Sequence, residues 1–257
     1  MKEETEFKPK PLVEIGGRPI LWHIMKIYQH YGYKEFILTL GYKGNMIKEY
    51  FLNARTFVND FTLKTKDNAI TLHTDGHDDL TITFVDTGLN TLTGERIRKV
   101  KDYIGGSEFM VTYGDGVGNI DIPKLLEFHR GQKTAGTITG VHPLSRFGVM
   151  DVDEKTSKVT NFKQFTVVSM ARDESKFEEF RHTHRKDYIN GGFMVFNNRL
   201  FDYLNKDSMI EETFVPMIQA GELSLYKHEG PWKAMDTYKD VEELNLFWQK
   251  DPFWKVW

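Results

Sequence analysis

The sequence predicts an α/β fold in which a mostly parallel central sheet carries helices on both faces, with small β-rich additions. Two short, almost wholly apolar runs, residues 35–42 (EFILTLGY) and 109–115 (FMVTYGD), are typical of strands buried on both faces of a parallel sheet. Each run is followed by residues with helical hydrophobic spacing, which is the order produced by right-handed crossovers. No linker, repeat or low-complexity tract divides the chain, so we expect residues 1–257 to form one domain.

The first half of the chain alternates between helical and strand patterns. Residues 18–31 have apolar side chains at helical spacing, and Gly32 ends this helix. After the strand at 35–42, a second amphipathic helix is expected over 45–54. Period-two alternation of Thr with Ile or Phe then predicts strands within residues 57–86. The patterns that complete this half are a helix at 94–104, the strand at 109–115 and a helix at 122–132.

The second half combines shorter strands with two helical stretches. The expected strands are in residues 134–143, 148–154, 158–165 and 191–197. Residues 166–187 are strongly charged and helical in character, which predicts a solvated insertion, with a lid or an oligomer contact as alternatives. Helical spacing returns at 210–221 and in the C-terminal segment 237–257.

Composition and charge exclude several classes of protein. Thirty-four Lys and Arg residues against 37 Asp and Glu give a formal charge of -3, which is too balanced for binding a nucleic-acid backbone. The chain has no cysteine, which excludes disulfides, zinc–thiolate sites, iron–sulfur clusters and thiol nucleophiles. No apolar run approaches the ~20 residues that span a bilayer, and the first residues do not form a signal peptide. We therefore expect a cytoplasmic protein that binds neither nucleic acid nor membrane.

Two aspartates are candidate metal ligands. Asp115 follows an apolar strand directly, between Gly114 and Gly116, and α/β sheets bind ligands beyond the carboxyl ends of their strands. Carboxylate oxygens at this place suit Mg²⁺, which prefers hard oxygen ligands and substrate phosphates. An aspartate between glycines is also ordinary turn chemistry. Asp236, in PWKAMDTYKD, fits either a metal ligand or the N-cap of the helix that follows.

Two cationic side chains are candidate phosphate ligands. Lys10 lies in a stiff, extended Lys-Pro-Lys-Pro segment, which could present its ammonium to a phosphate as a localised charge. A solvated basic turn is the alternative. Arg96 stands at the start of a predicted helix, where free backbone amides and a guanidinium together hold anions. An ordinary arginine on a helix surface is the alternative there.

Similarity to a known family extends along nearly the whole chain. The segments that carry it are KPKPLVEIGGRPILWHIMKIY, GYKGNMIKEYF, VDTGLNTLTGERIRKV, VTYGDGVGNIDI, RFGVMDV, INGGFMVFN, MDTYKDVEELNLFW and PFWKVW. In these segments the chain resembles the sugar-phosphate nucleotidylyltransferases. The GYKG and DTG…TGxR segments favour the branch of that family that uses CTP.

The resemblance implies a Rossmann-like nucleotidyltransferase fold and a specific reaction. In that reaction a phosphate oxygen of α-D-glucose 1-phosphate attacks the α-phosphorus of CTP, which gives CDP-glucose and pyrophosphate for deoxysugar and surface-polysaccharide synthesis. The resemblance also implies that Asp115 and Asp236 bind Mg²⁺ and that Lys10 acts with Asp115 in catalysis, on the triphosphate. Further contacts, to the nucleotide or the sugar, are implied for Thr91, Arg96, Gly114, Asn190 and Gly191.

A homo-oligomer is expected on two grounds. The family that the chain resembles forms oligomers. The C-terminal segment also carries more aromatic side chains than a solvated tail should expose, namely Phe247, Trp248, Phe253, Trp254 and Trp257.

The chain departs from the family in two places. Family members begin with a strand and a glycine-rich phosphate loop of the type AGGxGTRL, and this sequence starts where that loop ends, so we expect an N-terminally shortened product. Where the family has Glu-Lys-Pro, this chain has Lys163-Gln164-Phe165-Thr166, which moves the lysine by two positions along the strand. Two other interpretations therefore stay open: a catalytically inactive sugar-nucleotide-binding or assembly homologue, and an active enzyme with a different base or sugar.

Overall fold

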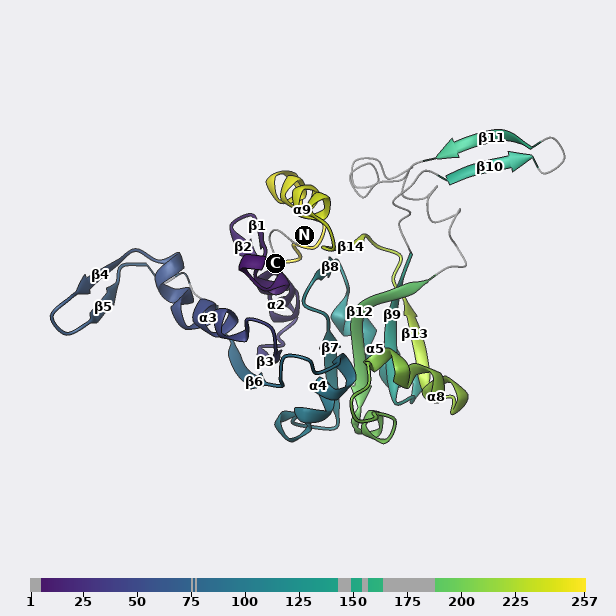
Figure 1. Cartoon of the computed structure of the whole chain (residues 1–257), viewed down its shortest axis with the longest axis horizontal. Helices are drawn as coiled ribbons and strands as arrows, with labels where there is room; N and C mark the ends of the chain where they lie inside the picture. The colour runs from purple at the N-terminus through teal and green to yellow at the C-terminus, as the bar shows by residue number, and fades with distance from the viewer. Residues whose placement is uncertain (1–5, 75, 77, 143–148, 154–156, 164–187) are drawn as a thin grey trace.

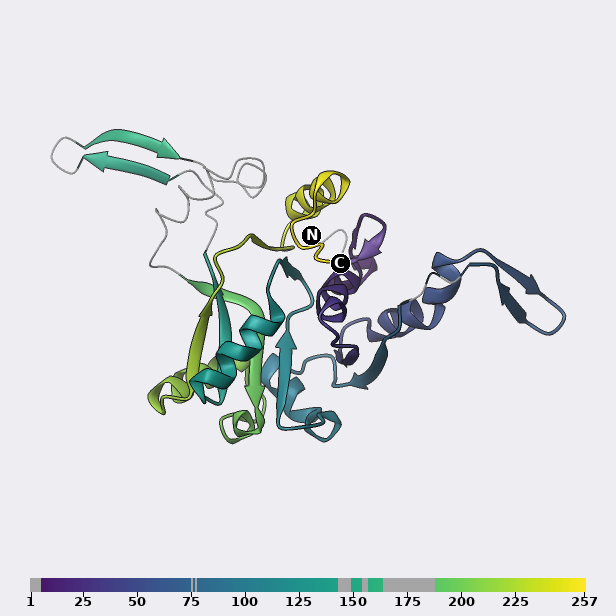
Figure 2. The ribbon, with the colours of Figure 1, turned by 180° about the vertical axis from the view of Figure 1, so that it is seen from behind.

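The structure is a computed structural model that describes residues 6–74, 76, 78–142, 149–153, 157–163 and 188–257. The predicted insertion at 166–187 lies outside the described residues. Figures 1 and 2 show a body of strands and helices from which α3 and the β4–β5 hairpin extend to one side. The α-helices are α2 (Ile20–His30), α3 (Gly44–Val58), α4 (Thr93–Lys99), α5 (Ile122–Gln132), α8 (Phe214–Gln219) and α9 (Tyr238–Lys250). Short 3₁₀ helices are η1 (Lys10–Leu12), η2 (Lys101–Tyr103), η3 (Asn198–Asp202) and η4 (Ile210–Thr213).

The largest sheet in the described part of the chain has four strands in the order β13-β9-β12-β7. Their bounds are Leu223–Lys227, Gly136–Val141, Ile189–Asn197 and Glu108–Thr112. β13 runs parallel to β9, whereas β12 runs antiparallel to both β9 and β7. A second parallel pair joins β3 (Glu35–Leu40) to β6 (Thr81–Asp86).

The remaining strands form four antiparallel pairs. They are β1 (Glu14–Ile15) with β2 (Arg18–Pro19), β4 (Phe61–Lys64) with β5 (Ala69–Leu72), β8 (Gly116–Gly118) with β14 (Trp232–Ala234), and β10 (Val149–Asp153) with β11 (Lys158–Lys163).

The prediction of a mostly parallel central sheet is wrong for the described strands, which form separate sheets. In the four-stranded sheet one strand pair is parallel and two are antiparallel. The physical reason is that β12, buried from Gly191 to Phe196, shows the continuous apolar pattern of any strand covered on both faces. That pattern reports burial and carries no information on the direction of the neighbouring strands.

Helices do cover both faces of β12, as predicted. Phe193 and Val195 pack into a core that includes residues of α2, α5 and α9. Met194 and Phe196 point the other way and pack with η3, η4 and α8 residues, because successive side chains of a strand alternate between its faces. β12 therefore contributes side chains to two apolar clusters, one on each of its faces. Because β7 pairs with β12, this packing also fixes the position of the end of β7.

The C-terminal segment is helical only as far as Lys250, where α9 ends. The chain then returns over α2, and Trp254 is fully buried there, with its Nε1 donating to His23 Nδ1 at 3.3 Å. Phe247 is also buried. Trp248, Phe253 and Trp257 are partly buried against the same core, so these aromatic residues do not support the oligomer expectation that was based on them.

His23 should make stability depend on pH. Burial lowers the pKa of His23 from its ordinary 6.5 to about 4, and the ring is held neutral between Ile15 O and Trp254. The unfolded chain therefore binds a proton between pH 6.5 and about 4 that the folded chain does not, so the free energy of unfolding falls as pH falls through this window. We expect His23→Gln to remove about 3 kcal/mol of the decrease between pH 7 and pH 4, at about 1.4 kcal/mol per pKa unit. Urea unfolding at several pH values measures it, and parallel curves for the two proteins would contradict it.

In the part of the chain that the structure covers, each helix is too short or too polar to cross a membrane.

Candidate active site

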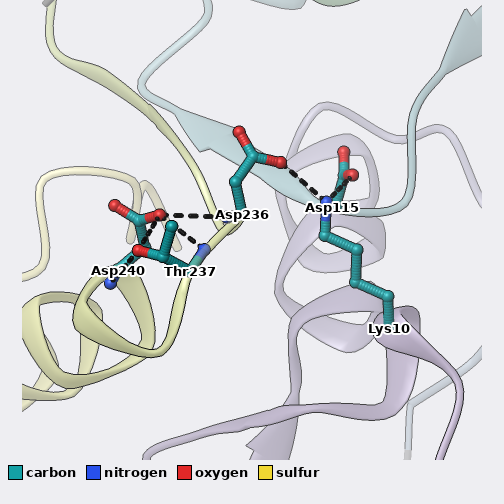
Figure 3. A network of polar contacts seen from close by, with 5 residues as sticks. All are labelled: Lys10, Asp115, Asp236, Thr237 and Asp240. Atoms are coloured by element: carbon teal, nitrogen blue, oxygen red, sulfur yellow. Dashed lines mark hydrogen bonds and ion pairs between the residues drawn. The ribbon is translucent and has the colours of Figure 1, made fainter. Parts of the chain in front are cut away.

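The ammonium of Lys10 lies between the two predicted metal ligands. The backbone is extended at Pro9, as predicted, but Lys10 already begins the 3₁₀ helix η1, which has Pro11 in its first turn. Its Nζ is 2.5 Å from Asp115 Oδ2 and 2.8 Å from Asp236 Oδ1 (Figure 3). Three residues that the sequence places at widely separated positions thus form one cluster, the acidic centre.

A short antiparallel ribbon brings the two aspartates together. Gly116 of β8 pairs with Ala234 of β14, and the Met235 N–H donates to Asp115 O at 2.8 Å, which extends the ladder by one step. Asp115 and Asp236 consequently leave the same end of the ribbon. Gly114 lies against η1, where a Cβ would come within 3.2 Å of Pro11 Cγ, so the glycine allows the close approach that Lys10 needs.

The start of α9 fixes the position of Asp236. Thr237 is the N-cap of α9, and its hydroxyl accepts from the Asp240 N–H at 3.2 Å. Asp240 Oδ2 in turn accepts from the backbone N–H groups of Thr237 and Asp236 at 2.8 and 3.1 Å (Figure 3). The N-cap interpretation of Asp236 is therefore wrong, since Thr237 has that position. Sequence reasoning missed Asp240, although Thr-x-x-Asp before an apolar run resembles a capping box.

The acidic centre is polar, charged and partly open to solvent. The side chains of Lys10, Asp115 and Asp236 are 29, 31 and 49% exposed. Burial alone would lower the pKa of Lys10, but hydrogen bonds and charges from the two carboxylates outweigh it and hold the pKa above its ordinary value. The described residues contain no group of three or more His, Asp or Glu side chains that could hold a metal ion by themselves. Two carboxylates that already bind a cation fit Mg²⁺, which commonly takes one or two protein carboxylates and completes its shell with phosphates and water.

Asn190 lies at the start of β12, beside the end of β7. Its Oδ1 accepts from the Gly192 N–H at 2.9 Å, and its Nδ2 lies 3.4 Å from Tyr113 Oη. Tyr113, two residues before Asp115, also donates to the carboxylate of Glu211. Gly191 is packed tightly, since a Cβ there would come within 2.7 Å of Val141.

Tyr113 and Glu211 form a hydrogen-bonded pair beside Asn190 that the sequence did not reveal. Burial, reinforced by the Glu211 carboxylate, raises the pKa of Tyr113 well above its ordinary value, so the phenol keeps its proton. No local pattern marks Glu211, which comes from η4, 98 residues away from Tyr113 along the chain.

Thr91 and Arg96 lie together at the carboxyl ends of β3 and β6. Arg96 Nη1 donates to Leu40 O at 2.9 Å and to the Thr87 hydroxyl at 2.5 Å, and Thr91 Oγ1 donates to Thr87 O at 2.5 Å. Lys99 Nζ also reaches Thr87 O, at 2.8 Å. Arg96 thus holds the turn that follows β6.

Comparisons with known proteins identify the family of this chain. A model of the nucleotidyl transferase family matches residues 5–251. The chain belongs to this family. It is 43% identical over 261 residues to the probable glucose-1-phosphate cytidylyltransferase of Bacillus subtilis, with 100% of this chain and 95% of the relative covered. It is 38% identical, with the same coverage, to the glucose-1-phosphate cytidylyltransferase of Salmonella typhimurium.

Solved structures confirm the class of the fold. The HddC protein of Yersinia pseudotuberculosis superimposes with a TM-score of 0.62 at 20% identity, over 93% of this chain and 90% of that one. At this identity the likeness concerns the fold alone. This member of the nucleotidyl transferase family therefore has the predicted α/β nucleotidyltransferase fold, although its described strands are divided among several sheets.

Proposed function

We propose that this chain transfers the cytidylyl group of CTP to α-D-glucose 1-phosphate and releases pyrophosphate. The observation that carries the proposal is the identity of 43 and 38% over the full chain to glucose-1-phosphate cytidylyltransferases. The acidic centre supports it, because a lysine and two carboxylates at one place suit a reaction between two anions.

The chemistry requires charge neutralisation more than covalent help. An oxygen of the sugar phosphate forms a bond to the α-phosphorus of CTP, and the bond from that phosphorus to the bridging oxygen breaks. Pyrophosphate leaves with the electron pair. Positioning and electrostatic stabilisation supply most of the acceleration in such transfers. The ammonium of Lys10 would neutralise charge on the triphosphate oxygens.

The carboxylates of Asp115 and Asp236 would hold Mg²⁺, which supplies further neutralisation of phosphate charge when bound. In the structure the same carboxylates bind Lys10. We propose that Lys10 turns from these carboxylates to the triphosphate when the nucleotide binds, since the long, flexible lysine stem allows that movement.

We place the remaining contacts around this centre. Asn190 and Gly191 would lie along the sugar, and Thr91 and Gly114 along the nucleotide. Arg96 would act by holding the turn that follows β6, because its donors bind backbone and hydroxyl oxygens of residues 40, 87 and 89.

A pyrophosphate-release assay tests the proposal. The purified 257-residue chain is given glucose 1-phosphate, Mg²⁺ and one of CTP, UTP or dTTP. We expect release with CTP that exceeds release with either control nucleotide. Preference for another nucleotide would favour the enzyme with a changed base. Tight CDP-glucose binding without turnover would favour the inactive homologue, and both results would contradict the proposal.

A further inference from the structure

Three polar side chains from distant parts of the chain form a hydrogen-bonded row at the edge of the four-stranded sheet. Glu211 of η4 accepts from the Tyr113 hydroxyl, and Asn190 Nδ2 lies 3.4 Å from the same hydroxyl oxygen. Tyr113 directly follows β7, and Asn190 is the second residue of β12. Because β12 runs antiparallel to β7, the start of β12 lies beside the end of β7. The row therefore lies at the sheet edge that also carries Asp115.

The donor and the acceptor of each bond in the row follow from chemistry. The Gly192 N–H can only donate, so the atom of the Asn190 amide that lies 2.9 Å from it is the oxygen Oδ1. The amide nitrogen therefore faces Tyr113. A carboxylate only accepts, so Tyr113 gives its single hydrogen to Glu211, and the phenol oxygen is the acceptor for Asn190 Nδ2.

These bonds orient the half-buried side chain of Asn190. The χ2 torsion of an asparagine is broad and roughly two-fold, so one contact at Oδ1 leaves the plane of the amide loosely defined. The second contact, at Nδ2, defines it. An amide nitrogen carries two diverging hydrogens, so directing one of them at Tyr113 also fixes the direction of the other. Asn190 thus offers a ligand at this edge an N–H donor, which pairs with an oxygen lone pair.

Glu211 is exposed, but the element that carries it is firmly held. The Ile210 N–H donates to Thr93 Oγ1 at 3.0 Å, and the Glu95 N–H donates to Ser208 O at 3.2 Å, so η4 and the residues before it are bound to α4. Ile210 itself is buried in the apolar cluster below. The bond from Tyr113 to Glu211 is therefore not needed to hold η4, and its main effect is on the orientation of the phenol.

We propose that Tyr113 and Glu211 are positioning residues for the sugar phosphate, which act by holding the Asn190 amide with its nitrogen toward the substrate. The inference rests on the proposed function, since it requires the sugar phosphate to lie along Asn190. Tyr113 and Glu211 themselves need not touch the substrate. The alternative is a structural brace between η4 and the end of β7, and the experiments below separate the two.

Steady-state kinetics of pyrophosphate release by the full chain tests the proposal. We expect Tyr113→Phe to raise the KM for glucose 1-phosphate about tenfold, while the KM for CTP stays within about twofold of the wild type. Tyr203→Phe is the matched control, because Tyr203 packs against the same apolar cluster as Tyr113, and it should change neither constant. A structural brace predicts less folded enzyme, and hence a lower apparent kcat, with both KM values unchanged. That result would overturn the proposal.

Variants of Glu211 cover the case in which Tyr113→Phe fails to fold, because Glu211 is exposed. Glu211→Ala should also raise the KM for glucose 1-phosphate. Glu211→Gln should restore most of the affinity, since the amide oxygen of Gln still accepts from the phenol. In an Asn190→Ala background, Tyr113→Phe and Glu211→Ala should each change this KM by less than about twofold, because the residue through which they act is absent. Additive effects would overturn the proposal.

Calorimetric titration separates this inference from the proposed function. Tyr113→Phe should weaken the binding of CDP-glucose about tenfold and that of CTP less than twofold, whether or not the chain turns over. A wild type that releases pyrophosphate with CTP, but whose sugar constants do not respond to Tyr113, overturns this inference alone. A wild type that binds CDP-glucose in a Tyr113-dependent manner without turnover overturns the proposed function alone. A wild type that neither turns over nor binds CDP-glucose overturns both.

Discussion

Replacing Asp115 with Asn is expected to lower kcat/KM for CTP-dependent pyrophosphate release by about 10³-fold, the scale measured when one electrostatic contact to a transition state is removed. Asn keeps the shape of the side chain but removes the negative charge that lies 2.5 Å from the Lys10 ammonium. The backbone bond from Met235 N–H to Asp115 O does not involve the side chain, so the β8–β14 ribbon should persist. The loss therefore reports the charge and not the fold.

Two further measurements make this prediction specific. The Mg²⁺ concentration that gives half-maximal rate should rise, and Mn²⁺ binding in the absence of substrates should weaken. Asp102→Asn is the control, because it removes the same charge from an exposed position on η2. If Asp115→Asn kept the Mg²⁺ dependence of the wild type, Asp115 would return to the simpler role of a turn residue.

The sequence located the parts of this site better than their arrangement. Apolar patterns correctly marked β7 and the acid that follows it, since burial of a strand leaves a strong signal in its composition. The ribbon that joins Asp115 to Asp236 left no such signal, because β8 is the three residues Gly116–Gly118 and has no periodicity to read. Asp115 and Asp236 lie close together because β8 pairs with β14, and local sequence patterns do not encode such a long-range pairing.

For Arg96 the sequence predicted an anion ligand, whereas in the structure its guanidinium binds oxygens of the protein. A guanidinium near a helix start is a reasonable anion ligand, and the sequence could not reveal that oxygens of the protein itself take its donors. The guanidinium of Arg96 packs directly against Gly41, where a Cβ would come within 2.5 Å of Arg96 Nη2. The glycine that follows β3 thus leaves room for the arginine. The sequence contains both residues, but only the structure shows that they are in contact.

The β4–β5 hairpin illustrates the limits of hydrophobic periodicity. Alternation within residues 57–86 correctly predicted strands, and β4, β5 and β6 all lie in that range. For β6 the apolar side chains pack against the body, whereas those of the β4–β5 hairpin are exposed. Period-two alternation shows that one face of a strand is apolar, and it does not show whether the rest of the chain covers that face.

Lys10→Met should separate two proposed roles of this lysine: neutralising charge on the triphosphate, and competing with a divalent cation for Asp115 and Asp236. Met has a similar length without the charge, so we expect kcat/KM to fall by about 10²- to 10³-fold as the charge on the triphosphate loses its partner. Mn²⁺ binding without nucleotide should become tighter in the same variant. The reason is that the ammonium, which lies 2.5 and 2.8 Å from the two carboxylates, competes with a divalent cation for them.

Opposite changes in rate and metal affinity distinguish this role from a structural ion pair. A purely structural Lys10 would predict lower stability and weaker metal binding together, because loss of the pair would let the two carboxylates separate. Lys10→Arg is the matched control: it keeps the charge but replaces a compact ammonium with a planar fork, so it should keep metal binding weak while restoring only part of the rate. Unchanged rate and unchanged Mn²⁺ affinity in Lys10→Met would make Lys10 a solvated residue of the turn, and the acidic centre would then consist of its two aspartates alone.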